Sequence, residues 1–381
     1  MPGLKLTRRD LFRLSAAAAA LAALPAAAFM GGRDRRLLVL VDLKGGNDGL
    51  NTLVPYRDRT YREARPTLAL GPAEVVDTGQ GFGMHPALRP LAPLWEAGEM
   101  AWIHGLGYAP PNRSHFRSID IWNSASTERD EAGTGWLARV LPHDLPLHGI
   151  ALDGRAGPLK GASNVLQMDR LDVFLRLGKN LHAIAAQAEN PALEHVLRVW
   201  NRVSRNAKRL AEALENVKVP VETFPNTPLG RQMKDAARLA ASDLDLPVIK
   251  VRLNGFDTHA GQKETHAERL RMLADALRAF ADAMRAIGRW NDVLVVTWSE
   301  FGRRVVENAS RGTDHGTAAA HFLLGGRVRG GHHGTPPSLQ ELDNDDLVHT
   351  ADFRALYHTL ATDWLEVDSP WAKYGRFDVI A

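Results

Sequence analysis

Hydrophobic and polar residues follow two alternating patterns along this chain. Short apolar runs, typical of buried strands, alternate with longer segments in which apolar residues recur every three or four positions, as in amphipathic helices. The expected strands lie within 35–46, 100–104, 247–253, 292–298 and 320–326, and the expected helices within 88–97, from 114 onward, and within 190–217, 264–289 and 352–365. Strands that alternate with long helices predict an α/β fold, in which a mostly parallel sheet carries helices on both faces.

Polar residues gather where the expected strands end. In parallel sheets of this kind, ligands bind in the loops outside the carboxyl ends of the strands. The loops to examine are therefore those that follow Asp42, His104, Leu253, Trp298 and Gly326. Each contains, or is followed by, residues that can bind a cation or attack an ester.

Three of these loops contain candidate metal ligands. Asp42 stands at the end of the first strand, where its carboxylate either binds a cation or caps the strand end, while Asp48 and its neighbouring asparagines shape the turn. Asp257 and His259 form an Asp-x-His pair after a strand, which is typical of a metal site. Further donors follow in the segment TWSEFGRRVVENASRGTDHG: they are Glu300, Asp314 and His315.

The loop after the second strand ends in Arg113, Ser114 and His115, where a helix begins. Backbone N–H groups at a helix N-terminus favour an anion, and a serine placed there is positioned to attack a phosphorus or sulfur centre. Judged on the local sequence alone, Ser114 is simply the N-cap of the helix. His266, further along the chain, is expected to be an exposed helix histidine.

The N-terminus has the pattern of an export signal. Arg8 and Arg9 lie in LTRRDLF, ahead of an Ala-rich apolar stretch that ends in small residues at Ala26–Ala28. This matches a twin-arginine signal peptide over residues 1–28, with the translocation machinery as partner and a periplasmic or extracellular destination. A membrane anchor is the alternative, although the apolar stretch is short for a helix that needs about 20 residues. Residues 29–381 are expected to form one domain.

Composition narrows the chemistry. The chain has 381 residues, of which 45% are hydrophobic, and it contains no cysteine. Any metal must therefore bind to His, Asp or Glu, and disulfides and thiolate nucleophiles are excluded. The formal net charge of +3 is also the net charge of residues 1–28, which have four basic residues and one acidic residue. The remainder is formally neutral and has no basic and aromatic motif for nucleic acid.

Several motifs together resemble a known family. DLKGGNDGLNTLVPY, RSHFRSIDIW, GFDTHAGQ, SEFGRR and GTDHG look like the exported bacterial family catalogued as domain of unknown function 1501. That family is distantly similar to the alkaline phosphatase and sulfatase superfamily. The resemblance implies an alkaline-phosphatase-like three-layer α/β sandwich, with Ser114 at the position of the superfamily's nucleophile.

The resemblance also implies two metal sites. Asp257, His259 and His315 would form one, and Asp42, Ser114 and Glu300 would form an oxygen-only second site, with Asp314 orienting a neighbouring histidine. Imidazole ligands favour Zn, whereas an oxygen-only site favours Mg, Ca or Mn. A formylglycine sulfatase is not expected, because no proline stands two residues after Ser114.

Two functions remain open from the sequence. One is an exported metal-dependent hydrolase of phosphate or sulfate esters, in which Ser114 attacks, Arg113 or backbone N–H groups hold the anion, and His115 assists proton transfer. The other is a non-catalytic secreted binding or assembly protein on the same scaffold, because fold alone does not fix function. The substrate and the oligomeric state are open in both.

Overall fold

The computed structural model describes residues 36–128, 133–180, 190–220 and 223–381. The expected export signal, residues 1–28, lies outside the described residues. Among those that are described, every helix is too short or too polar to span a bilayer.

The described residues form a mixed sheet of nine strands. Strand β1 (Leu37–Lys44) lies inside it, between β8 (Val248–Asn254) and β9 (Val293–Trp298), and is parallel to both. The other strands are β5 (Met100–Gly107), β6 (Gly149–Ala151), β7 (Val165–Gln167), β10 (Ala319–Leu324), β11 (Gly331–His333) and β14 (Ala351–Asp352). The order is β11-β5-β10-β9-β1-β8-β6-β7, and β14 pairs with β5.

One strand runs against the others. β10 is antiparallel to both β5 and β9. Its beginning therefore lies at the edge where the parallel strands end, and its own end lies at the opposite edge. The loop after Gly326 was a wrong candidate for the ligand site for this reason, whereas residues just before β10, including Asp314 and His315, reach the correct edge.

The residues of β1 explain why the sheet is covered on both faces. Leu37, Val39 and Val41 belong to one buried apolar cluster, while Leu38 and Leu40 belong to a second. Successive side chains of a strand point to opposite faces, so a strand that is apolar at every position needs a cover on each side. This arrangement confirms the predicted α/β class with a mostly parallel sheet.

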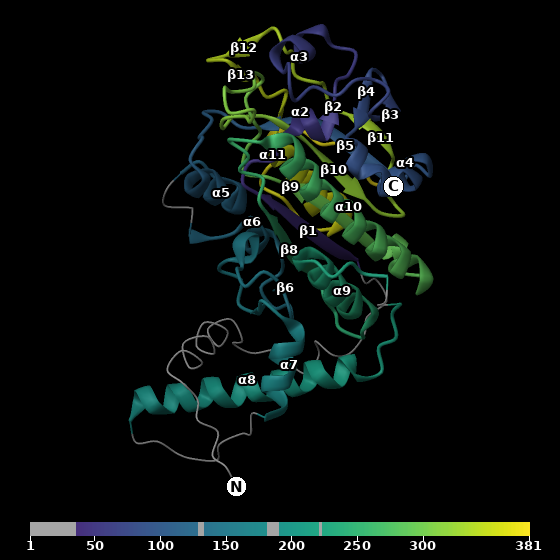
Figure 1. Cartoon of the computed structure of the whole chain (residues 1–381). Coiled ribbons are helices and arrows are strands. Elements are labelled where there is room, and N and C mark those ends of the chain that lie inside the picture. The colour runs from purple at the N-terminus through teal and green to yellow at the C-terminus, as the bar shows by residue number, and fades with distance from the viewer. Residues whose placement is uncertain (1–35, 129–132, 181–189, 221–222) are drawn as a thin grey trace.

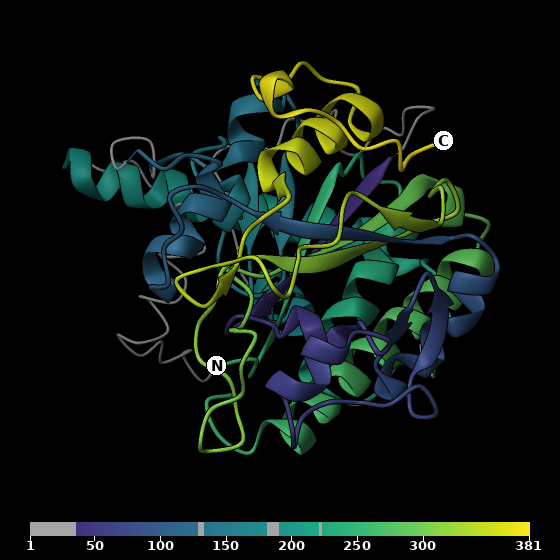
Figure 2. The same ribbon diagram turned by 90° about the horizontal axis from the view of Figure 1, so that it is seen from above.

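Two sets of helices provide the cover, one on each face of the sheet (Figure 2). On one side lie α9 (Pro228–Ala241), α10 (Gln262–Ala286), the 3-10 helix η2 (Pro86–Leu91) and α4 (Ala92–Glu96). On the other lie α5 (His115–Ser124), α6 (Trp136–Val140) and α11 (Phe353–Thr359). Trp122 of α5 stacks on Phe353 of α11, with ring centroids 4.3 Å apart, which ties these helices together.

The remaining elements lie around this sandwich. Figure 1 shows the long helix α8 (Pro191–Glu215) packed against α7 (Leu171–Asn180) at the end of the molecule beyond β6. Short elements complete the chain: α2 (Gly49–Thr52), α3 (Arg59–Ala64), β2 (Leu53–Val54), β3 (Val76–Gly79), β4 (Phe82–Met84), η4 (Gly157–Leu159), η5 (Trp290–Asp292), β12 (Leu342–Asp343), β13 (Asp346–Leu347), the π-helical turn η6 (Leu360–Trp364) and η7 (Ala372–Tyr374).

Candidate metal centre

Four segments meet at the carboxyl edge of the sheet. Asp257 and His259 follow β8, and Glu300 follows β9. His315 precedes β10, and His115 is the first residue of α5. The order and direction of the strands thus bring together residues that are up to 200 positions apart in the sequence.

Asp257 lies at the centre of three imidazole rings. Its Oδ1 atom is 3.1 Å from Nε2 of His259 and 3.1 Å from Nε2 of His315. Its Oδ2 atom is 3.4 Å from Nε2 of His115. The ligand atoms that His115, Asp257 and His315 offer all lie within 4.8 Å of one another, which is close enough to share one metal ion.

Behind each ring stands a hydrogen-bond acceptor for the other nitrogen, Nδ1. The pairs are His115 with Glu300 Oε1 at 2.8 Å, His259 with Asp314 Oδ1 at 2.9 Å, and His315 with the carbonyl oxygen of Arg113 at 2.9 Å. Carboxylate and carbonyl oxygens only accept hydrogen bonds, so Nδ1 of each ring carries the proton. A neutral ring then presents Nε2 with a free lone pair.

The free lone pairs point toward one another. Nε2 of His259 and Nε2 of His315 are 3.0 Å apart, and Nε2 of His115 is buried without a hydrogen-bond partner among the described residues. Bare nitrogens at this separation repel unless a proton or a cation lies between them. Histidines whose Nδ1–H is held by an oxygen are the usual arrangement around protein-bound metals. The donor set therefore fits a divalent ion.

Glu300 is a buried carboxylate fixed from several sides. Besides the ring of His115, it accepts the N–H of Gly45 at 3.1 Å and the hydroxyl of Ser299 at 3.2 Å. Burial by itself would raise the pKa of Glu300, but the hydrogen bonds from His115 and from backbone N–H groups lower it below its ordinary value. Glu300 is thus an ionised anchor for His115.

Arg303 holds the loops of the centre together. Its guanidinium is fully buried and donates to the carbonyl oxygens of Gly45, Gly46, Phe256 and Thr313. It also donates to Asp257 Oδ1 at 2.6 Å. Partial burial opposes the ionisation of Asp257, but the hydrogen bond and the charge of Arg303 lower its pKa to about 2. Arg303 pins the loops and keeps Asp257 charged.

Asp42 is buried beside Lys250 of β8. It is 5% exposed, and its Oδ2 atom is 3.8 Å from Nζ of Lys250. Burial raises the pKa of Asp42 to about 7, although the charge of Lys250 opposes the shift. Glu300 is hydrogen-bonded to His115, and its charge is also among the influences that raise the pKa of Asp42. The oxygen-only site of Asp42, Ser114 and Glu300 stays a prediction.

Arg113 and Ser114 directly precede His115, the first residue of α5. Ser114 is exposed at the N-cap position of α5, but its side chain accepts no capping hydrogen bond. Ser114 thus occupies the N-cap position that the local sequence predicted, without a capping hydrogen bond from its side chain. Arg113 pairs with the buried carboxylate of Asp346 through its guanidinium, and its carbonyl oxygen orients His315.

A buried polar network supports the loop after β1. Asp48 caps α2 and pairs with the fully buried Arg65 at 2.6 Å. His266 was expected on the surface, and this was wrong: its side chain is 1% exposed and its Nε2 lies 3.0 Å from Asn47 Oδ1. The buried face of α10 therefore begins one turn earlier than the sequence pattern indicated. The ring of His266 can be buried there because the polar loop provides it with a hydrogen-bond partner.

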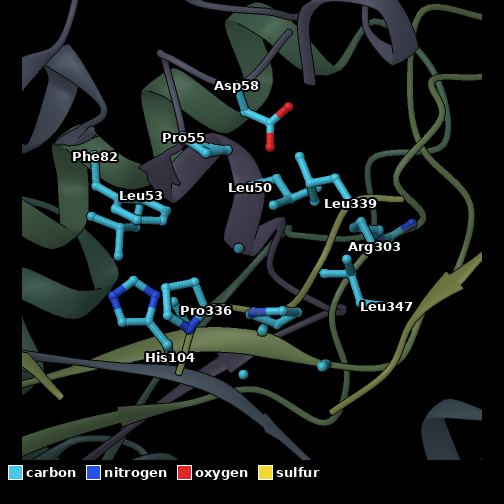
Figure 3. A pocket seen from close by; sticks show the side chains of 16 residues that line it. Leu50, Leu53, Pro55, Asp58, Phe82, His104, Arg303, Pro336, Leu339 and Leu347 are labelled. Carbon is cyan, nitrogen blue, oxygen red and sulfur yellow. The ribbon is translucent and has the colours of Figure 1, made fainter. Parts of the chain in front are cut away.

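A separate small pocket of about 130 Å³ lies beside this loop (Figure 3). Its walls are mostly apolar, with Leu53 and Phe82 on one side and Leu339 on the other, and His104 is also at its wall. Burial lowers the pKa of His104 to about 4, so this ring is neutral at physiological pH. None of the imidazoles around Asp257 lines this pocket.

Comparisons with solved structures give low similarities. The C-terminal periplasmic domain of EcEptC from Escherichia coli, in complex with Zn, is 10% identical, with 88% of this chain and 84% of that chain covered and a TM-score of 0.39. A protein in the alkaline phosphatase superfamily from Vibrio parahaemolyticus is 11% identical, with 87% and 72% covered and a TM-score of 0.33. At this level of similarity, no activity transfers to this chain.

The lipoteichoic acid synthase LtaP from Listeria monocytogenes is similar to the same degree, at 12% identity, with 80% of this chain and 70% of that chain covered and a TM-score of 0.31. No curated protein matches the sequence. A family profile described as "Protein of unknown function (DUF1501)" matches residues 106–367. This range is well over half of the chain and contains all three histidines around Asp257, so the chain belongs to the DUF1501 family, as its motifs predicted.

Proposed function

We propose that this chain is an exported, metal-dependent hydrolase of phosphate or sulfate esters. The observation that carries the proposal is the convergence of imidazole Nε2 atoms on Asp257, with an acceptor behind each ring. Asp257, His259 and His315 would hold the ion and leave a position open, which is the pattern of catalytic rather than structural metal sites. A bound divalent ion supplies positive charge that stabilises the anionic transition state of ester cleavage.

The residues around the ion have separate roles in the proposed reaction. Ser114 is the nucleophile, because its hydroxyl is exposed and free of a capping bond next to His115. The hydrogen bond to Glu300 raises the pKa of His115 above its ordinary value. This makes His115 a stronger base, suited to take the proton of the Ser114 hydroxyl. Glu300 stabilises the ring once it is protonated.

The proposed reaction has two steps, formation of a serine ester and its hydrolysis. The Ser114 oxygen forms a bond to phosphorus or sulfur while the bond to the ester oxygen breaks, and the proton passes through His115 to the departing alcohol. Water then attacks phosphorus or sulfur and gives a proton to His115. The bond to the Ser114 oxygen breaks, His115 returns the proton to that oxygen, and inorganic phosphate or sulfate leaves. The backbone N–H groups at the start of α5 lie where they favour an anion.

Hydrolysis of p-nitrophenyl phosphate and p-nitrophenyl sulfate tests this function. We expect turnover that depends on added Zn, Mn, Mg or Ca, and a loss of about 1000-fold or more in kcat in Ser114→Ala, as expected for a nucleophile. Ser163→Ala, which changes another exposed serine, is the matched control and should retain the wild-type rate. Full activity in Ser114→Ala, or no turnover with any of these ions, would exclude this mechanism.

A non-catalytic, metal-binding scaffold is the second candidate. The observation that favours it is that one group of potential metal ligands, His115, Asp257 and His315, is found among the described residues, where the resemblance implied two sites. In that case the ion would stabilise the loops rather than act on an ester. Metal would then raise the melting temperature of the wild type and of Ser114→Ala equally, with no hydrolysis by either.

A further inference from the structure

A polar cavity of about 410 Å³ lies beside the candidate metal centre, on the face of the sheet covered by α5. Asp42 and Lys44 of β1 and Lys250 of β8 form one wall, and Asn123 of α5 belongs to the opposite wall. The volume is in the range of small-molecule sites, about 300–1000 Å³. Nothing in the proposed hydrolysis uses these residues.

Two oxygen atoms in the wall of this cavity have no partner. Asp42 Oδ1 and Asn123 Oδ1 are both buried, and neither accepts a hydrogen bond from any residue that the structure describes. The Asp42 side chain itself is 5% exposed. Buried acceptors are nearly always satisfied in folded proteins, by the protein, by water or by a ligand. The wall is therefore built to receive hydrogen-bond donors such as hydroxyl groups.

Positive charge dominates the rest of the lining. Five basic side chains line the cavity, against the acidic Asp42 and Asp120; they are Lys44, Arg155, Lys160, Lys250 and Arg252. Asp153 neutralises part of this charge, since its Oδ2 atom is 2.5 Å from Lys250 Nζ and 3.6 Å from Arg252 Nε.

The other three cations, Lys44, Arg155 and Lys160, pair with no carboxylate within the described part of the chain. Unpaired cations around a concave site attract and hold an anion. The cavity thus combines buried acceptors for hydroxyl groups with free cations for an anionic group.

The geometry points to a binding site for a small polyhydroxylated anion, such as a sugar that carries a phosphate, sulfate or carboxylate group. Lys44, Arg155 and Lys160 bind the anionic group, and Asp42 and Asn123 accept hydrogen bonds from hydroxyl groups. The site is near the metal centre, because Asp120 follows His115 by five residues on α5, which is about 7.5 Å along a helix axis. Binding here stands independently of the hydrolase proposal, since it requires neither metal nor turnover.

Isothermal titration of the full chain in EDTA tests this site. The probes are glucose 6-phosphate and glucuronate, with glucose and inorganic phosphate as partial ligands that lack one of the two features. We expect both complete probes to bind at least about tenfold more tightly than either partial ligand. The double variant Arg155→Ala/Lys160→Ala should weaken binding of glucose 6-phosphate about tenfold or more, and Lys44→Ala should weaken it independently.

Lys208→Ala is the control for loss of a surface cation, because Lys208 is an exposed residue of α8. It should leave the affinity unchanged. His259→Ala should also bind the probes as the wild type does, which separates this site from the metal centre. The proposal is wrong if neither complete probe binds, if inorganic phosphate binds as tightly as glucose 6-phosphate, or if the cationic variants bind like the wild type.

Discussion

The candidate metal centre depends on Asp257, whose carboxylate contacts all three imidazole rings. The family resemblance implied that Asp257, His259 and His315 form one metal site. The structure brings these three together and adds His115. The acceptors behind the rings were not predictable in detail, since one of them is a backbone carbonyl, that of Arg113, which has no sequence signal.

Asp42 shows what the pairing of strands adds to the sequence. Residues 38, 40 and 42 point to the same face of β1, and Leu38 and Leu40 lie in the apolar cluster under α5 and α11. The alternation along the strand thus places the carboxylate toward Lys250. The sequence showed an acidic residue near a strand end, but the register that decides its face comes from the pairing of β1 with its neighbours.

The burial of Asp42 predicts a pH-dependent stability. Its pKa in the folded protein is about 7, raised by burial from an ordinary value of 3.8. An unfolded chain ionises this group at the lower value, so folding stability falls as the pH rises from about 4 to 7. Asp42→Asn removes this loss. We expect the difference in the free energy of unfolding between the variant and the wild type to increase by about 2 to 3 kcal/mol from pH 5 to pH 8.

Urea unfolding at both pH values measures this gain. Asp120→Asn is the control, because Asp120 is an exposed residue of α5 whose neutralisation should shift stability equally at both pH values. A stability difference between Asp42→Asn and the wild type that stays constant from pH 5 to pH 8 would show that Asp42 ionises at its ordinary pKa.

At the scale of elements, long buried strands were predictable and short ones were not. β1, β8 and β9 have continuous apolar runs, which require no knowledge of the rest of the chain. Strands β6 and β7 have three residues each, too few to show a pattern. The direction of β10 was also hidden, since an apolar run reads the same in both directions; only its neighbours β5 and β9 define it as antiparallel.

Gly312, in the loop before β10, is a position where we expect a larger side chain to disturb the candidate metal centre. A Cβ atom at this position would lie 2.3 Å from the backbone carbon of His259, so the two loops of the centre are in contact here without room for a side chain. Gly312→Ala should push the Asp314–His315 segment away from His259. We expect it to weaken metal binding at least about tenfold and to lower stability by about 1 to 3 kcal/mol, the usual cost of overpacking.

Metal titration and thermal unfolding of Gly312→Ala measure both effects. Gly133→Ala is the matched control, because its new Cβ would meet no heavy atom within 4 Å. It should resemble the wild type in both measurements. Wild-type metal affinity in Gly312→Ala would mean that the spacing of the two loops does not control the centre.

In the whole molecule, the order of the strands in the sheet brings the residues of the candidate metal centre together. β1 lies between β8 and β9, and β10 lies beside β9, so the segments that carry Asp257, Glu300 and His315 meet at one edge. The α/β class and the family were predictable because both depend on local runs and motifs. The contact of His115 with Asp257 was not, because it depends on where α5 lies after the sheet has formed.

The metal content of the purified protein tests whether an ion binds at Asp257. The full chain, purified without chelator, incubated with Zn, Mn, Mg or Ca and freed of excess ion, should retain about one divalent ion per chain, as expected for a single ligand set. His259→Ala and His315→Ala should lose it, while His143→Ala, which changes an exposed histidine elsewhere, should keep it. Elemental analysis that finds far less than one ion in the wild type, or equal content in all four proteins, would contradict a metal centre at Asp257.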